Sequence, residues 1–259
     1  MSEKQQLYCF EMAKKGIETV IDDLTNEDIE WEKDKLTGNV MNAHRSSNNK
    51  YNKFRMTTYH WGITPKELLV LSSKESARLK WDTQTDSITN LIEHTPPTGY
   101  DTLTVTLTCA KKLMGGLVSA RHMRMCMASK QFEDGRIVCG YSHIEDIKKA
   151  GCKKTKLPGT KATTFPSGFI LTPVTRKQFK EFLKTEEGKK ITPDPLWELE
   201  GDENEVVGTI YDIVVHIDLG GWFAAWQINK FASGAFSQGI QEMDKYIRGD
   251  YREVQQQNN

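Results

Sequence analysis

The sequence predicts an α+β domain in which a curved antiparallel sheet packs against a long C-terminal helix. A helical pattern stands near the N-terminus, strand-like segments separated by turn signals follow one another between residues 88 and 174, and a long amphipathic segment comes last. The 259 residues allow one large domain or two small ones, and neither an internal repeat nor a long linker divides them. We therefore expect one domain over residues 5–248 and a disordered tail at 249–259.

Charge and hydropathy exclude several classes of protein. Lys and Arg together number 35, as do Asp and Glu, so the net charge is zero and no global field attracts nucleic acid. No apolar run approaches the ~18 residues of a membrane-spanning helix, which excludes a membrane-embedded channel or transporter. Five scattered cysteines and an N-terminus without a signal-peptide pattern favour a reduced, cytoplasmic chain.

The N-terminal third is predicted to contain a helix, strands and two short helices. Residues 5–24 contain the apolar spacing of an amphipathic helix, which is expected to end before Asp22-Asp23. A pair of strands is expected between residues 29 and 55, and residues 54–60 alternate as a strand does. Thr64-Pro65-Lys66-Glu67 has the N-cap, the proline and the glutamate of a capping box, so a short helix through Leu71 follows, with a further turn at 75–79.

The remainder of the chain reads as a meander followed by a helix, a strand and the last helix. The meander strands are expected at 88–94, 102–109, 121–129, 136–142 and 160–174. Residues 176–190 are helical in pattern and, with the acidic 198–205 loop, form an insertion at about 175–205. Residues 206–219 are expected to form a long strand.

The last helix is predicted to run from Gly220-Gly221 to about Arg248. Its apolar positions Phe236, Ile240, Met243 and Ile247 fall on one face. A helix of about 28 residues is roughly 40 Å long, enough to lie across a single antiparallel sheet. A curved sheet closed by one helix leaves a cavity between them.

Several short motifs occur in order along the chain. They are Trp81-Asp82, Gly116-Leu117-Val118-Ser119-Ala120-Arg121-His122-Met123, Ser142-His143, Phe169-Ile170-Leu171-Thr172-Pro173, His216-Ile217-Asp218-Leu219-Gly220-Gly221-Trp222-Phe223 and Ile228-Asn229. Together they resemble the START domain, the StAR-related lipid-transfer module, over essentially the whole chain. Arg121-His122-Met123 replaces the usual Arg-Asp-Phe and Ala224 replaces a common proline, so the chain is identified as a divergent member.

The resemblance implies a helix-grip fold, in which the sheet wraps around the last helix and encloses a tunnel for one lipid. It implies a lipid-binding or lipid-transfer protein, without enzymatic activity or cofactor, that is a monomer and touches membranes transiently. Burial of acyl chains is itself favourable by about 0.8 kcal/mol per methylene, so an apolar tunnel is a sufficient mechanism. Three alternatives stay open: a cyclase-type or hydrolase-type enzyme on the same architecture, a sterol-binding START protein, and a scaffold whose cavity is vestigial.

The expected ligand residues follow from the resemblance. Arg78-Leu79-Lys80-Trp81-Asp82 is similar to the Arg-x-x-Trp-Asp of phosphatidylcholine-binding members, where the arginine meets the lipid phosphate and the carboxylate meets the choline. The alternative is a salt-bridged helix end. Thr108 and Met127 stand where sterol-binding members carry a charged pair, which favours a phospholipid over a sterol. The other expected ligand residues are Arg121 and Phe236.

Two surface segments are candidates for membrane contact. Lys111-Lys112 precede four apolar residues in a turn, namely Leu113, Met114, Leu117 and Val118, which are expected to touch a bilayer at the tunnel mouth. The alternative is simple packing on the last helix. The lysines at 148, 149, 153, 154 and 156 are either a solvated loop or a contact for anionic head groups.

Catalytic and metal motifs give weaker signals. The six histidines show no paired ligand spacing, no Cys-x-x-Cys occurs, and we expect no metal. No Gly-x-Ser-x-Gly or Gly-rich phosphate loop is present. Ser142-His143 falls on an expected strand without an identifiable acid, so His143 is interpreted as a sheet residue.

Overall fold

The computed structural model describes residues 2–112, 119–153, 157, 159–186, 188–190, 200–221 and 225–251. The helices are α1 (Glu3–Thr25), α2 (Pro65–Ser73), α3 (Glu75–Arg78), α4 (Arg176–Phe182) and α5 (Ala225–Tyr246), with short turns η2 (Gly188–Lys190) and η3 (Ile247–Tyr251). The strands are β1 (Glu32–Lys33), β2 (Met41–Arg45), β3 (Lys53–Trp61), β4 (Thr85–His94), β5 (Thr102–Ala110), β6 (Arg121–Gln131), β7 (Ile137–His143), β8 (Thr160–Lys161), β9 (Thr163–Thr164), β10 (Ser167–Thr175) and β11 (Val206–Asp218).

The described strands form one large sheet. Its order is β1-β2-β3-β11-β10-β7-β6-β5-β4, and every neighbouring pair along this path is antiparallel. Strand β8 adds in parallel to β6, and β9 pairs with β11. Strands β4 to β7 pair in chain order, as the predicted meander requires. The predicted α+β class and curved antiparallel sheet are confirmed.

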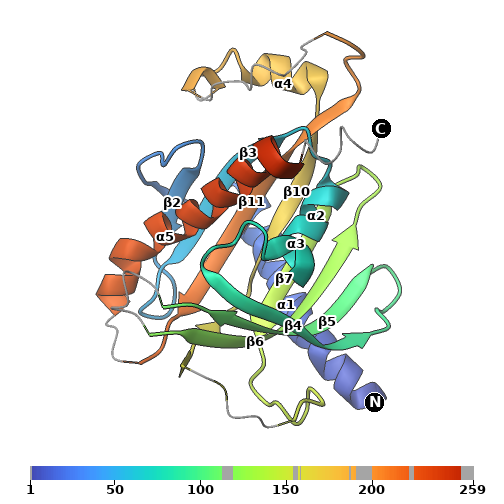
Figure 1. Ribbon diagram of the computed structural model, residues 1–259, viewed down its shortest axis with the longest axis vertical. Coiled ribbons are helices and arrows are strands. Elements are labelled where there is room, and N and C mark those ends of the chain that lie inside the picture. The colour runs from blue at the N-terminus through green and yellow to red at the C-terminus, as the bar shows by residue number, and fades with distance from the viewer. Residues whose placement is uncertain are drawn as a thin grey trace.

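Helices cover both faces of the sheet. Successive strand residues point to opposite sides, so apolar residues on both sides need a covering layer. In Figure 1, α5 crosses the sheet in front while α1 runs behind it. On β11, Val214 packs with Cys9, Met12 and Ile17 of α1, whereas its neighbour Val215 belongs to the core beneath α5. The sheet therefore has an outer core under α1 and an inner core under α5.

Two glycines let α1 lie directly on β7. A Cβ at Gly16 would stand 2.4 Å from the Tyr141 backbone nitrogen, and one at Gly140 would stand 2.1 Å from the Ile17 nitrogen. No real side chain tolerates such distances, so helix and strand meet backbone to backbone here. This contact fixes the outer layer and leaves the inner face to α5.

Several element boundaries differ from those predicted. Helix α1 does not end before Asp22-Asp23 but continues to Thr25, because Asp23 is buried and pairs with Arg45 and Lys53 instead of capping in solvent. The single strand expected at 160–174 is three pieces, β8, β9 and β10, since the first two pair with different strands. The helix expected at 176–190 ends at Phe182.

The capping box and the last helix match their predictions more closely. The Thr64 hydroxyl accepts from the Glu67 backbone N–H, and the Glu67 carboxylate accepts from the Thr64 N–H at 2.8 Å. Helix α5 ends at Tyr246 and is continued by a π-helical turn over Ile247–Tyr251, so the predicted end near Arg248 lies within this turn. Ile240, Met243 and Ile247 are all buried in the inner core, as their spacing predicts.

Candidate functional site

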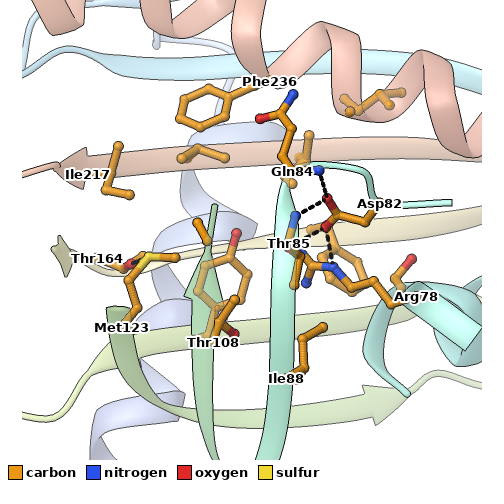
Figure 2. A pocket seen from close by; sticks show the side chains of 18 of the residues that line it. Arg78, Asp82, Gln84, Thr85, Ile88, Thr108, Met123, Thr164, Ile217 and Phe236 are labelled. Carbon is orange, nitrogen blue, oxygen red and sulfur yellow. Dashed lines mark hydrogen bonds and ion pairs between the residues drawn. The ribbon is translucent and has the colours of Figure 1, made fainter. Parts of the chain in front are cut away.

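A cavity of about 250 Å³ lies between the inner face of the sheet and α5 (Figure 2). Its wall is mostly apolar. Five of the described lining residues are methionines, whose flexible side chains adapt to differently shaped ligands; they are Met56, Met123, Met125, Met127 and Met243. A mostly apolar wall with a few polar groups is typical of a site for a small molecule.

The structure brings the predicted ligand residues together around this cavity. Residues from α3 and the turn after it, from β5, β6 and α5, share its wall; they are Arg78, Trp81, Asp82, Thr108, Arg121, Met127 and Phe236. Their contact with a ligand stays a prediction. The expected membrane residues Leu113, Met114, Leu117 and Val118, and also Lys154 and Lys156, lie outside the described residues.

Arg78 and Asp82 form an ion pair at the polar wall of the cavity. Arg78 Nε donates to Asp82 Oδ2 at 2.8 Å, and Asp82 is only 7% exposed. The Thr85 hydroxyl donates to Oδ2 at 2.7 Å, and the backbone N–H groups of Gln84 and Thr85 donate to Oδ1 at 3.1 and 3.0 Å. The carboxylate thus accepts four hydrogen bonds from the chain, which is about its full capacity.

Trp81 contacts Arg78 and helps to hold the Arg78–Asp82 ion pair in place. Its indole N–H donates to the Leu71 carbonyl at 3.0 Å, and the Arg78 guanidinium lies 5.8 Å from its ring centre. The ring therefore attaches the α3 end to α2 and orients the arginine by a cation–π contact. Arg78 is consequently held in place while its side chain stays 31% exposed.

Two tyrosines that sequence analysis did not predict also line the cavity. Burial raises the pKa of Tyr141 and of Tyr211, so both phenols are neutral hydrogen-bond donors near neutral pH. Arg78 is an electrostatic neighbour of both, which places them on the polar side. The alternation of Tyr211 with the inward-facing Ile213 and Val215 is the signal that could have identified it.

Arg121 is the second cavity arginine and is 3% exposed. Its Nε donates to the Leu219 carbonyl at 2.6 Å, and its Nη1 donates to the Ser119 hydroxyl at 2.6 Å and to the Ser119 carbonyl. Burial lowers the pKa of Arg121 below its usual value. A guanidinium nevertheless stays charged at neutral pH. The side chain connects the start of β6 to the turn that leads toward α5.

Thr108 and Met127 face the cavity but are not direct cross-strand partners. Thr108 stands opposite Met123, and Met127 stands opposite Thr104. The Thr106 hydroxyl contacts Met127 Sδ at 3.5 Å. This wall is therefore built of hydroxyl and thioether groups, and no ion pair joins β5 to β6 among its described residues.

The loop before β4 holds α5 over the cavity. Gln84 Nε2 donates to the Ala235 carbonyl at 3.1 Å, and the Thr83 hydroxyl donates to the Glu242 carboxylate at 2.7 Å. Gly239 also lines the cavity, and a Cβ built there meets nothing within 4 Å. The helix is thus attached by polar contacts at its edge and presents a gap at its centre.

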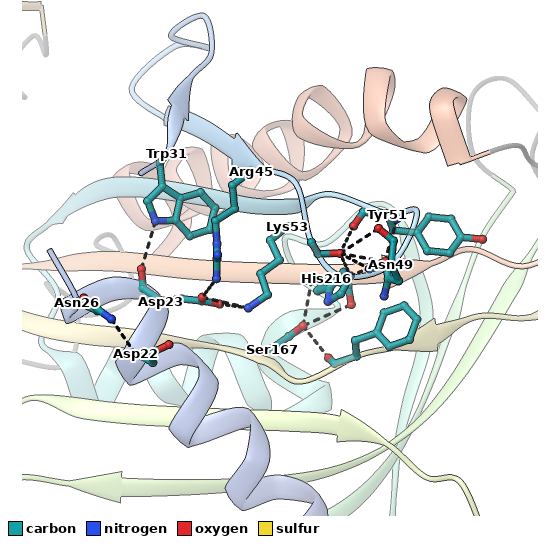
Figure 3. Close-up of polar contacts among 12 residues, drawn as sticks. Asp22, Asp23, Asn26, Trp31, Arg45, Asn49, Tyr51, Lys53, Ser167 and His216 are labelled. Carbon is teal, nitrogen blue, oxygen red and sulfur yellow. Dashed lines mark hydrogen bonds and ion pairs between the residues drawn. The ribbon is translucent and has the colours of Figure 1, made fainter. Parts of the chain in front are cut away.

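A separate polar cluster lies near the outer core, where the end of α1 meets β2 and β3 (Figure 3). The Asp23 carboxylate accepts from Lys53 Nζ at 2.7 Å and from Arg45, while His216 Nε2 lies 3.1 Å from Asn49 Oδ1 and 3.3 Å from Ser47 Oγ. These residues are not among those lining the cavity. The cluster connects α1, β3 and the loop before β3, which is a structural role.

His143, the remaining candidate for catalysis, is a residue of the sheet, as predicted. His143 lies at the end of β7 with Nδ1 3.2 Å from the Thr164 carbonyl, and burial lowers its pKa. In the part of the chain that the structure covers, no group of three or more His, Cys, Asp or Glu side chains is arranged to hold a metal ion. None of the helices in that part is both long and apolar enough to span a bilayer.

A sheet closed by one long helix over an apolar cavity is the architecture of StAR-related lipid transfer domains. The solved structure of human StAR-related lipid transfer protein 5 has a TM-score of 0.71 and 18% identity to this chain, and the likeness covers 95% of this chain and 99% of that one. Human STARD10 has a TM-score of 0.63 at 11% identity, covering 91% and 79%. The lipid transfer and protein localization domain of human StarD13 has 0.61 at 12%, covering 90% and 93%.

The chain therefore has the START fold, as the motifs predicted. No family model and no curated protein matches the sequence. The likeness to the solved structures concerns the backbone fold, so the choice of ligand depends on the cavity residues of this chain.

Proposed function

We propose that this chain is a divergent START protein that binds one lipid, a phospholipid in preference to a sterol, and moves it between membranes. The observation that carries the proposal is the apolar cavity beneath α5 with Arg78 on its polar wall. A guanidinium is the preferred partner of a phosphate, and a methionine-rich wall accepts acyl chains. The fold shared with the lipid transfer proteins named above supports the same class.

The cavity is too small to hold a phospholipid without enlarging. Its 250 Å³ lies below the roughly 300–1,000 Å³ of common small-molecule pockets, and a two-chain lipid is larger still. The cavity must therefore enlarge when a phospholipid enters. The flexible methionines and a displacement of α5 are the two parts of the wall that allow this enlargement.

A catalytic function is less well supported. Asp82 is the one carboxylate among the described lining residues, and its oxygen lone pairs are occupied by donors of the chain. A general base needs a free lone pair within reach of the substrate. We therefore propose that the lipid is carried unchanged.

The transfer step is proposed to use the Leu113, Met114, Leu117 and Val118 turn as the membrane contact. Replacing Leu113 and Met114 by Asp places charge in the bilayer interface, so transfer between vesicles should slow strongly while the lipid bound at equilibrium changes little. An unchanged transfer rate would reject this contact and favour the lysines at 148–156.

A competition experiment tests the lipid class. Purified protein is incubated with vesicles that contain equal amounts of labelled phosphatidylcholine and labelled cholesterol, and both labels are counted on the re-isolated protein. We expect phosphatidylcholine to exceed cholesterol. Preferential cholesterol binding would reject the phospholipid assignment, and failure to bind either lipid would reject the proposal as a whole.

A further inference from the structure

The charges that line the cavity do not balance. Three described lining residues carry charge, namely Arg78, Asp82 and Arg121, so the wall has an excess of one positive charge. Arg78 and Asp82 neutralise each other across 2.8 Å. Arg121 is the source of the excess.

Arg121 is satisfied by neutral acceptors and by no carboxylate among the described residues. Its hydrogen bonds go to the Leu219, Ser119 and Ala120 carbonyls and to the Ser119 hydroxyl, all through Nε and Nη1. Its Nη2 makes no hydrogen bond to the described part of the chain and retains two N–H donors. Buried charges in proteins are ordinarily paired, so a guanidinium this deeply buried calls for a counter-charge.

The strand register brings Arg121 to the same end of the sheet as Arg78. Arg121 stands opposite Ala110, and Ala110 stands opposite Thr85, whose hydroxyl binds Asp82. Two strand spacings separate the Thr85 and Arg121 backbones, about 10 Å. One head group can therefore meet the Arg78–Asp82 pair on one side and Arg121 on the other.

We propose that the bound phospholipid is acidic, and that its anionic phosphate is the missing counter-charge of Arg121. This inference rests on the proposed function and narrows it to lipids whose head group carries net negative charge. Asp82 contributes little to the choice of head group, because its oxygens are already occupied. A zwitterionic phosphatidylcholine would bring its own cation into a cavity with one uncompensated positive charge, whereas phosphatidic acid would neutralise that charge.

All lipids are offered in the same vesicles, so attraction between the protein surface and a charged membrane is the same for each lipid. Differences among the bound lipids then report on the cavity. Vesicles of phosphatidylcholine with 10% phosphatidic acid and 10% oleate are incubated with the protein, and the lipids on the re-isolated protein are quantified by mass spectrometry. We expect phosphatidic acid to be enriched over phosphatidylcholine at least tenfold relative to the vesicles, which corresponds to about 1.4 kcal/mol. A bound ratio equal to the vesicle ratio, or enrichment of oleate alone, would overturn the inference.

Variants at Ala110 test whether Arg121 causes the enrichment of phosphatidic acid, because they leave Arg121 and its hydrogen bonds in place. Ala110→Asp puts a carboxylate opposite Arg121 on the cavity wall, and Ala110→Asn adds the same volume without the charge. The ratio of bound phosphatidic acid to bound phosphatidylcholine should fall at least fivefold in the Asp variant relative to the Asn variant. Equal enrichment in the two variants would contradict the role of Arg121. If the wild-type protein extracts no lipid at all, it is the proposed function that fails.

Discussion

The Thr83 hydroxyl donates a 2.7 Å hydrogen bond to the Glu242 carboxylate, and this bond fastens the loop before β4 to helix α5. The Thr83 backbone N–H donates to the same oxygen at 3.2 Å. Neither residue is among those that line the cavity, and a displacement of α5 is one of the two changes by which we propose that the cavity enlarges. The bond therefore resists opening without contacting the ligand.

Removing this hydroxyl should accelerate lipid exchange. One hydrogen bond contributes about 0.5–1.5 kcal/mol, so Thr83→Val is expected to raise the rate of lipid release by about twofold to tenfold. The release rate is measured by stopped-flow transfer of a fluorescent phospholipid to excess acceptor vesicles. Thr98→Val, at an exposed loop threonine, is the matched control. Equal rates in the two variants would show that α5 does not open at the Thr83–Glu242 bond.

Arg78→Ala should weaken phospholipid binding much more than it weakens the fold. A hydrogen bond to a charged group contributes about 1.5–3 kcal/mol, so the loss in affinity should be tenfold or more. Stability should fall by only about 1 kcal/mol, because Arg78 is partly exposed and Asp82 keeps its three other donors. Vesicle extraction and urea unfolding measure the two effects.

Arg78→Lys is the comparison variant, since it keeps the charge but loses the planar fork. We expect the affinity of Arg78→Lys for phospholipid to lie between that of the wild-type protein and that of Arg78→Ala. Proportional losses of binding and stability in both variants would instead make Arg78 and Asp82 a structural ion pair.

His216 should make the fold sensitive to acid. Burial, followed by the nearby Lys53, lowers its pKa from 6.5 to about 4, while Tyr51 and Asp23 act in the opposite direction. The unfolded chain therefore takes up the proton first. The stabilisation from neutral His216 is complete above about pH 6.5 and is lost as the pH falls toward 4, by up to about 3 kcal/mol.

This pH dependence can be measured by urea unfolding at pH 7, 5.5 and 4.5. The variant His216→Gln cannot titrate, so its free energy of unfolding should fall less steeply than that of the wild-type protein across this range. Parallel curves for the two proteins would contradict the assignment.

The gap at Gly239 offers a way to fill the cavity without removing a side chain. Gly239→Leu should place its side chain where the lipid lies and reduce phospholipid extraction strongly, while the added helix propensity offsets part of any strain. Gly234→Leu is the matched control, because Gly234 lies on the exposed side of α5 and does not line the cavity. Similar extraction by both variants would show that the ligand does not occupy the space beneath Gly239.

The sequence predicted those parts of the fold that depend on local pattern. The Thr64 capping box involves residues three positions apart, and the inward face of α5 follows from helical spacing, so both were correct. The extension of α1 past Asp22 was not predicted, because the partners of Asp23 lie 22 and 30 residues away and local charge pattern cannot reveal them.

The candidate site shows the same limit. Arg78, Trp81 and Asp82 could be identified because they form one short motif. Tyr141 and Tyr211 could not be assigned to the polar wall, because their proximity to Arg78 depends on where the fold places β7 and β11 relative to α3. The charge excess at Arg121 likewise became visible only when its hydrogen-bond acceptors were known.

The central claim is that the cavity beneath α5 holds a single lipid. Native mass spectrometry of the wild-type protein, after incubation with mixed phospholipid vesicles and re-isolation, tests it most directly. We predict one added mass per chain that corresponds to a single phospholipid and that is absent from Gly239→Leu but present in Gly234→Leu. A wild-type protein that remains lipid-free, or a lipid mass retained equally by Gly239→Leu, would contradict the claim.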